Sequence, residues 1–182
     1  MAKLQLSKKG AMELIGHEAI VQTRYKDSVG VFTIGVGHTA KAGAPDPKTF
    51  TGSMPVKDVL DLFIKDVQKY VDAVNKAIKA NVTQTEFDAL VSFHYNTGAI
   101  AKAALVTSIN KGDKKTAARQ FLNFNKPKEV IGRRTKEQKL FAEGVYSNNG
   151  KATVYPVKPS LKPDFGKGKS VDLAKLVDGA AG

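Results

Sequence analysis

The stretch from Glu18 to His38 reads EAIVQTRYKDSVGVFTIGVGH, and the predicted fold is built outward from it. Two runs inside it, residues 23–27 and 31–36, are rich in β-branched and aromatic side chains. Three residues that end in Gly30 separate the runs, and a glycine-containing connection of this length is typical of a β-hairpin. Gly35 in the second run and Gly37 just after it either loosen that strand or allow a close approach to its backbone. The sequence therefore predicts a hairpin here.

A helix is expected immediately before the hairpin. Ser7 is a favoured N-cap residue, and residues 8–17 then carry Ala, Leu and Ile on one helical face. Glu18 falls at the end of this helix, Asp27 at the end of the first strand, and Thr33 on the returning strand. This order brings a glutamate and an aspartate to the walls of one cleft.

Two carboxylates on either side of a cleft suit the hydrolysis of a glycosidic bond. One must be protonated to donate to the leaving oxygen, and the other must be ionised to activate water or attack the sugar. Glu18 is the candidate acid, because the partial negative charge at a helix C-terminus disfavours a carboxylate. Asp27 is expected to stay ionised on its turn, and the Thr33 hydroxyl to hold the water that Asp27 activates. The alternative is that both acids are ordinary solvated surface residues, which composition alone favours.

The spacing of these residues resembles that of the phage-type, T4-like lysozymes of glycoside hydrolase family 24. The sequences YKD at 25–27 and TIGVGH at 33–38 belong to the resemblance, as do Thr83–Gly98 and Val130–Gly144. It implies an α+β, mostly α, lysozyme-like fold, in which a small β-hairpin lobe and a larger helical lobe flank a cleft. The family's catalytic residues carry over to three positions: Glu18, Asp27 and Thr33.

The resemblance implies supporting roles for further residues. His38 is expected to form an ion pair with Asp66, although Asp66 suits an exposed pairing with the lysine three residues on equally well. One of Arg133 and Arg134 is expected to reach the cleft and face Glu18, with Arg134 preferred. The alternative for the two arginines is a surface pair on a basic face.

Sugar contacts are also expected from the resemblance. Tyr95 falls where the family has an aromatic residue that contacts the sugar chain, and it suits a core aromatic equally well. The family's small hydroxyl residue near positions 103 and 104 is replaced here by alanine, and its tryptophan after the next helix is replaced by Phe124. The expected substrate contacts are Tyr95, Asn96, Gln120, Arg134 and Thr39.

The remaining helices are predicted from local signals. Apolar residues recur at helical spacing from Pro55 to Ile78. A capping box at Thr83–Glu86 opens the next helix, which Gly98 ends. Two further helices are expected at residues 99–110 and 114–123.

The C-terminal part departs from the compact family pattern. Residues 1–145 form the predicted lysozyme-like catalytic domain, and residues 146–182 a Pro-, Gly- and Lys-rich extension. Ser170 is expected to cap a short helix at Val171–Val177 that Gly179 stops. A helix this short is unstable alone in water, so it either docks on the catalytic domain or binds a surface. Docking is favoured, through three apolar side chains: Leu173, Leu176 and Val177.

Composition limits the cofactors and indicates the partners. The 182 residues include no cysteine and three dispersed histidines, so no thiol chemistry, metal site or other cofactor is expected. The formal net charge of +12 favours a polyanionic partner. A nucleic-acid-binding protein and a membrane-active protein, both without catalysis, are the alternatives. Charge alone supports nucleic-acid binding, no recognition motif accompanies it, and no nucleic acid partner is expected.

The leading prediction is a muramidase that cleaves the β-1,4 bond between N-acetylmuramic acid and N-acetylglucosamine in bacterial peptidoglycan. The resemblance implies inversion, for which the carboxyl groups lie about 6.5–9.5 Å apart rather than about 5–5.5 Å. The first residues are too polar for a signal peptide or membrane anchor, so a monomer made in the host cytoplasm is expected to reach the wall through a membrane hole. This fits a phage endolysin that lyses its host, with its basic surface and C-terminal segment also contacting anionic outer-membrane or wall polymers.

Overall fold

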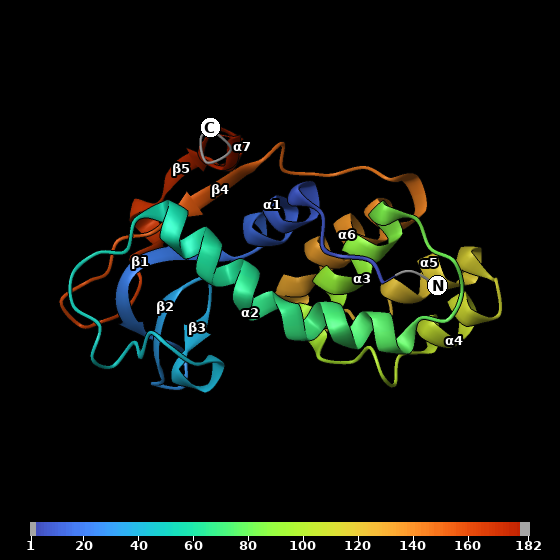
Figure 1. Ribbon diagram of the computed structural model, residues 1–182, viewed down its shortest axis with the longest axis horizontal. Coiled ribbons are helices and arrows are strands. Elements are labelled where there is room, and N and C mark those ends of the chain that lie inside the picture. The colour runs from blue at the N-terminus through green and yellow to red at the C-terminus, as the bar shows by residue number, and fades with distance from the viewer. Residues whose placement is uncertain (1–2, 179–182) are drawn as a thin grey trace. The chain divides into compact units, whose positions relative to one another are not determined.

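A computed structural model describes residues 3–178 of the chain (Figure 1). The chain divides into two compact units, and the division falls inside α1 and α2. We call Met1–Glu13 with Val67–Asn149 the helical unit, and Leu14–Asp66 with Gly150–Gly182 the sheet unit. The helices are α1 (Lys8–Gly16), α2 (Val56–Ala77), α3 (Gln84–Thr97), α4 (Ala104–Asn110), α5 (Lys114–Phe121), α6 (Ile131–Glu143) and α7 (Leu173–Asp178).

The sheet unit contains one five-stranded sheet in the order β3-β2-β1-β4-β5. The pairs β1–β2, β2–β3 and β4–β5 are antiparallel, whereas β4 runs parallel to β1. The two C-terminal strands, orange to red in Figure 1, therefore extend the same sheet that contains the N-terminal hairpin. The strands are β1 (Ala19–Lys26), β2 (Phe32–Gly35), β3 (His38–Thr39), β4 (Lys151–Val154) and β5 (Lys169–Asp172).

The predicted hairpin is present, with β1 and β2 as its strands. Its turn is closed by the Asp27 N–H, which donates to the Val31 carbonyl at 3.0 Å, and by the Gly30 N–H, which donates to the Asp27 carbonyl at 3.1 Å. Gly30 has a φ of +85°, a conformation that glycine adopts without steric cost. The first strand begins four residues before the predicted start at 23, because the chain enters the sheet directly after α1 and buries Ile20 completely.

The close approach predicted for a glycine of the second strand occurs at Gly35. Its φ is +67°, and a Cβ atom built there would lie 3.4 Å from the Cγ1 atom of Val59 on α2. Val59 is fully buried, as are its neighbours on the same helix face, Leu60 and Phe63, with at most 7% exposure. The first half of α2 therefore packs against the hairpin, and a glycine on β2 makes room for it.

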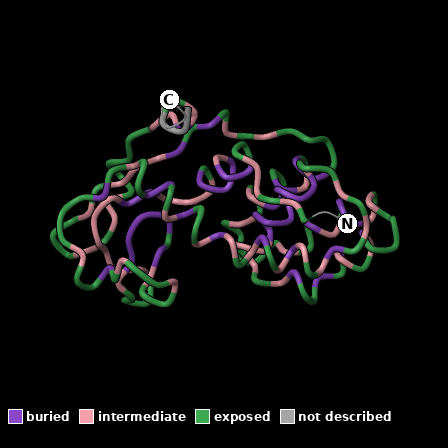
Figure 2. Tube along the Cα trace, in the orientation of Figure 1, coloured by how far each residue is buried: buried purple, intermediate pink, exposed green. Residues whose placement is uncertain are grey.

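The helical unit is built around α3, whose residues from Glu86 to Phe93 are all buried (Figure 2). Its predicted capping box is confirmed, because the Thr83 hydroxyl accepts from the Glu86 N–H and the Glu86 carboxylate accepts from the Thr83 N–H. Gly98 ends the helix in a left-handed conformation, also as predicted. Two helix boundaries were wrong: the helix predicted at 99–110 begins at Ala104 after a turn, and that predicted at 114–123 ends at Phe121.

The N-cap predicted at Ser7 is confirmed, and its hydroxyl makes a second contact. The Ser7 Oγ atom accepts from the Gly10 N–H at 2.9 Å and also contacts the Asp88 carboxylate of α3. Asp88 is 1% exposed and also accepts from the Tyr146 hydroxyl at 2.8 Å. Burial, with the charge of Asp88 among the smaller causes, raises the pKa of Tyr146 to about 12. A Cβ atom at Gly10 would overlap Asp88, so this glycine is needed for the contact.

The C-terminal segment differs from the prediction in how its helix begins. Ser170 lies in β5 rather than at an N-cap, and the Asp172 Oδ1 atom accepts from the Ala174 N–H at 3.1 Å at the start of α7. Leu173 is fully buried, and its N–H donates to the Gly150 carbonyl at 2.8 Å, a contact within the C-terminal segment. Docking of this helix on residues 1–145 stays a prediction. The side chains of Leu176 and Val177, and all of Gly179, lie outside the described part of the chain.

Candidate active site

Glu18 lies at the junction between α1 and β1. The helix ends at Gly16, and the Glu18 N–H donates to the Ile15 carbonyl at 3.0 Å before β1 starts at Ala19. Ile15 and Ile20 on either side are at most 2% exposed, whereas Glu18 itself is half-buried. The apolar neighbours thus anchor the backbone on either side of this half-buried glutamate.

Asp27 follows the other end of β1 and organises the hairpin turn with its side chain. Its Oδ1 atom accepts from the Val29 N–H at 3.0 Å and from the Val31 N–H at 2.8 Å. Aspartate commonly stabilises a turn through such side-chain-to-backbone bonds. Within residues 3–178, no hydrogen bond to the Oδ2 atom is present. The turn therefore fixes the orientation of the half-buried carboxylate and leaves one of its oxygens for a further partner.

Tyr25, Thr33 and Thr39 form one row across the three strands of the N-terminal half of the sheet. Tyr25 is paired with Thr33, and Thr33 with Thr39. Directly opposed residues of antiparallel strands present their side chains on the same face. Thr33 is 2% exposed, and its hydroxyl donates to the Val31 carbonyl at 3.0 Å. The row places two of the predicted site residues beside a tyrosine that belongs to the YKD motif.

The negative charges of both candidate carboxylates act on Tyr25. Burial raises the pKa of Tyr25 to about 12, with smaller contributions from the negative charges of Asp27 and Glu18. The contribution of Asp27 is the larger of the two. Sequence reasoning quoted Tyr25 as part of a motif and gave it no role. The signal that identifies it is its position two residues before Asp27 and opposite Thr33.

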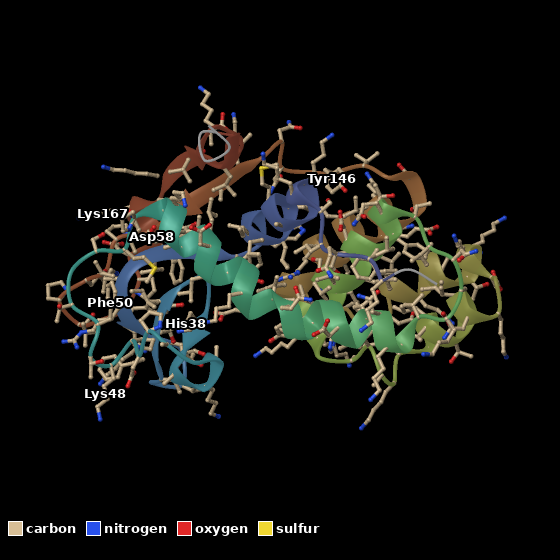
Figure 3. All side chains as sticks on the ribbon, viewed as in Figure 1. His38, Lys48, Phe50, Asp58, Tyr146 and Lys167 are labelled. Atoms are coloured by element: carbon tan, nitrogen blue, oxygen red, sulfur yellow. The ribbon has the colours of Figure 1, made fainter. Side chains whose placement is uncertain are left out.

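His38 supports the hairpin from the opposite side of the row. Its Nδ1 atom lies 2.6 Å from the Asp66 Oδ2 atom, and its Nε2 atom lies 2.9 Å from the Pro45 carbonyl oxygen. The predicted contact between His38 and Asp66 is therefore present (Figure 3 labels His38). Both partners are acceptors, so the imidazole makes both hydrogen bonds only when each ring nitrogen carries a proton. The 2% exposed ring ties β3 to α2 and to the loop at Pro45.

In the helical unit, Arg133 and Arg134 converge on Glu137, a residue that the sequence analysis quoted without assigning a role. The Arg133 Nε atom donates to Glu137 Oε1 at 2.9 Å, and Arg134 Nη1 lies 3.0 Å from Glu137 Oε2. The Ser92 hydroxyl also donates to Glu137 Oε1, at 2.6 Å. Arg134 further donates to Asn96 Oδ1 at 2.7 Å. Arg134 and Glu137 are each 1% exposed, so this is a buried ionic cluster.

Burial opposes the charges of this cluster. It raises the pKa of Glu137, and the nearby Arg133 and Arg134 guanidinium groups act in the opposite direction. It also lowers the pKa of Arg134, which the Glu137 carboxylate counteracts. The alternative of an exposed surface pair is wrong for Arg134, because its guanidinium is buried over the ring of Phe93 at 5.3 Å. Whether Arg134 faces Glu18 stays a prediction.

The other predicted sugar contacts also belong to the helical unit. The half-buried ring of Tyr95 lies against Tyr70, with ring centroids 4.9 Å apart. Gln120 accepts a hydrogen bond from the Ser108 hydroxyl at 2.9 Å. Phe124, in place of the family's tryptophan, packs its edge against Phe93 at a centroid distance of 4.7 Å. These contacts hold the side chains in place, and their roles toward substrate stay predictions.

Two searches of the described residues bear on cofactors and membranes. Between residues 3 and 178, no three His, Cys, Asp or Glu side chains gather as a metal site requires. Over the same residues, no helix has the length and apolar character needed to cross a bilayer.

Comparison with known proteins identifies the family. The sequence profile described as Phage lysozyme matches residues 16–137, more than half of the chain and a range that includes Glu18, Asp27 and Thr33. The chain belongs to the phage lysozyme family. The α+β, lysozyme-like fold class predicted from the sequence is confirmed by solved relatives. An endolysin from Escherichia coli O157:H7 phage FAHEc1 superimposes with a TM-score of 0.74 at 31% identity, covering 81% of this chain and 99% of that one.

Sequence relatives of this phage lysozyme family member carry the name endolysin. The endolysin of Salmonella phage P22 is 31% identical over 146 residues, which cover 76% of this chain and 98% of that protein. The endolysin of Bacillus phage PZA is 35% identical over 159 residues, or 82% of this chain. The chain spans 60% of the length of that Bacillus phage relative, so the two are similar over part of the longer protein.

Proposed function

We propose that this phage lysozyme family member is an endolysin muramidase that hydrolyses the β-1,4 bond between N-acetylmuramic acid and N-acetylglucosamine in peptidoglycan, to lyse the host cell. The observation that carries the proposal is the hairpin, in which β1 runs from the residue after Glu18 to the residue before Asp27, and Thr33 lies opposite Tyr25 on β2. The endolysins among the relatives support it. The non-catalytic alternatives, nucleic-acid binding and membrane disruption, gain no support from these relatives.

Glu18 is proposed as the general acid that protonates the leaving glycosidic oxygen. It lies two residues beyond the last residue of α1, where the negative end of the helix dipole disfavours a negative charge. Its position is half-buried. Donation to the leaving oxygen requires the protonated carboxyl group.

Asp27 and Thr33 are proposed to hold and activate the attacking water. The Asp27 Oδ1 atom is held by two backbone N–H groups, so the Oδ2 atom is the acceptor for a water proton. The Thr33 hydroxyl gives its proton to the Val31 carbonyl, so its oxygen is the acceptor for the second proton of that water. A water held by both acceptors presents a lone pair to the sugar. This mechanism inverts the anomeric carbon.

The remaining expectations belong to the same proposal. Residues 1–145 supply the catalytic domain, with Tyr95, Asn96, Gln120, Thr39 and Arg134 as substrate contacts. The net charge of +12 speeds encounter with an anionic wall, and anionic outer-membrane or wall polymers are the second proposed partner of the C-terminal segment. We propose a monomer that is made in the host cytoplasm and reaches the wall through a membrane hole.

The test is turbidity clearing of purified peptidoglycan by the wild type, Glu18→Gln and Asp27→Asn. General acid or base catalysis contributes roughly 10²- to 10⁴-fold, so each variant is expected to lose activity in that range while keeping its melting temperature. Glu143→Gln, at an exposed carboxylate on the end of α6, is the matched control and should clear peptidoglycan at the wild-type rate. Full clearing by a folded Glu18→Gln would overturn the proposal, and NMR of the product anomer tests the inversion separately.

A further inference from the structure

The C-terminal segment runs along β1 from the end near Glu18 to the end near Asp27. At the first end, β4 pairs in parallel with β1 through Ala19 and Ile20, and the Tyr155 N–H donates to the Ile20 carbonyl at 2.9 Å. This segment lies beyond residue 137, where the match to the family profile ends. The profile match does not include this segment, so it assigns no role to the segment's contacts with β1.

At the other end of β1, the same segment makes two hydrogen bonds to consecutive residues of the hairpin. The Lys26 N–H donates to the Leu161 carbonyl at 2.7 Å. The Lys162 ammonium group donates to the backbone carbonyl of Asp27 at 2.6 Å. Leu161 thus binds the Lys26 N–H and Lys162 binds the Asp27 carbonyl. These two backbone groups lie on either side of the peptide bond that joins Lys26 to Asp27.

The turn that makes these contacts is fixed by bonds of its own. The Leu161 N–H donates to the Lys158 carbonyl at 2.9 Å, and the Lys158 N–H donates to the Lys162 carbonyl at 2.8 Å. Residues 157 and 163 pair as an antiparallel bridge at its base. Leu161 has a φ of +59°, which is unfavourable for a residue with a side chain and occurs where the surroundings impose it. The imposed conformation directs the Leu161 carbonyl to Lys26.

We propose that the turn Lys158–Lys162, which we call the clasp, fixes the position of Asp27 relative to Glu18, and that Lys162 is a positioning residue for the reaction. This inference rests on the catalytic role proposed for Asp27. The turn is otherwise held by its own bonds: the Gly30 N–H donates to the same Asp27 carbonyl, and the Val29 and Val31 N–H groups donate to the Asp27 side chain. The clasp holds the backbone from which the Asp27 carboxylate projects, and misplacement of a reacting group by about 1 Å costs up to ~100-fold in rate.

The experiment measures kcat and KM on soluble peptidoglycan fragments for Lys162→Met and Lys162→Arg. Lys162→Met removes the donor and is expected to lower kcat by roughly 10-fold, because the carboxylate is less well positioned, with KM and melting temperature nearly unchanged. Lys162→Arg keeps a donor of similar reach and is expected to recover most of kcat. Lys167→Met, on the same segment (Figure 3) and without a side-chain hydrogen bond or ion pair among residues 3–178, is the matched control for loss of charge.

Three outcomes would overturn the inference: wild-type kcat in Lys162→Met, an equal loss in Lys167→Met, or a change confined to KM. Amide hydrogen exchange in the wild type provides a test that needs no variant, because the Lys26 N–H must be protected if the clasp is closed in solution. Rapid exchange at this amide would also overturn it. Asp27→Asn is measured in parallel. If it keeps full activity, the proposed function fails; if it is inactive while Lys162→Met is normal, only the clasp fails.

Discussion

Carboxylates occupy two contrasting environments in the two units of this protein. In the sheet unit, Glu18 and Asp27 are half-buried, and two backbone N–H groups hold the Asp27 Oδ1 atom. In the helical unit, Glu137 is 1% exposed and lies between two guanidinium groups. A carboxyl group that exchanges protons with a substrate must be reachable by that substrate and able to change its charge. A carboxylate that holds helices together needs permanent hydrogen-bond donors and the exclusion of water.

This contrast separates activity from stability, and the variant with the largest expected effect on stability is Glu137→Gln. It leaves the buried Arg134 guanidinium without a counter-charge, and breaking a buried ion pair in this way costs about 3–5 kcal/mol. The free energy of unfolding from urea denaturation measures the loss. Glu18→Gln is the matched comparison, since it makes the same substitution at a half-buried position and should leave the unfolding free energy nearly unchanged.

If Glu137→Gln lowers the free energy of unfolding by less than about 1 kcal/mol, the contrast between the two kinds of carboxylate is wrong. A loss that small is typical of solvated ion pairs at the surface. Folded Glu137→Gln protein is expected to keep catalytic activity at temperatures where it remains folded. Loss of activity without loss of stability would instead show that Glu137 acts on the reaction through Arg134, which is one of the proposed substrate contacts.

The pair of His38 and Asp66 is the counterpart of this cluster in the sheet unit, with a smaller expected effect. The Asp66 side chain is 11% exposed, so its desolvation is less complete than that of Glu137. Asp66→Asn keeps the shape and an acceptor oxygen but removes the charge, and a hydrogen bond to a charged group contributes about 1.5–3 kcal/mol. We expect a loss near the lower end of that range, measured by thermal and urea unfolding.

Asp58→Asn is the control on the same helix, at an exposed aspartate labelled in Figure 3. NMR of the His38 ring protons adds an independent measurement, because the Nδ1 proton that lies in the bond to Asp66 should shift in Asp66→Asn and not in Asp58→Asn. Equal unfolding free energies for the two variants would show that the contact between His38 and Asp66 does not stabilise the fold.

The features that the sequence predicted correctly are those with a local cause. The Thr83 capping box, the Gly98 helix stop and the hairpin turn at Gly30 each depend on residues within a few positions of one another. The contact of His38 with Asp66 came from family resemblance, since 28 residues separate the two and no local signal joins them.

The features that the sequence missed depend on pairing between distant segments. The parallel pairing of β4 with β1 joins residues such as Ile20 and Val154, and the β-propensity of either strand does not specify its partner. The polar composition of α6 suggests an exposed helix. Glu137 on this helix is nevertheless buried, because Ser92 of α3 and two arginines contact it. Tyr25 gained a role only through the register that sets it opposite Thr33.

The smallest expected effect concerns His94 of α3, which lacks the carboxylate partner that His38 has. Its ring meets the edge of Tyr70 at a centroid distance of 5.4 Å, and its Nδ1 atom accepts from the Ile100 N–H at 3.4 Å. Burial lowers the pKa of His94 from its ordinary value of 6.5. The unfolded chain therefore binds a proton at this residue at a higher pH than the folded protein does.

It follows that His94 makes stability fall as pH decreases through 6.5 toward the lowered folded value, and contributes no pH dependence above that window. His94→Gln removes the titrating group while keeping an acceptor for Ile100. The unfolding free energy of the wild type should therefore decrease relative to that of the variant as the pH is lowered from 8 to 5. A constant difference across that range, or a shift in favour of the wild type at acid pH, would mean that His94 gains a proton as readily in the folded helical unit as in the unfolded chain.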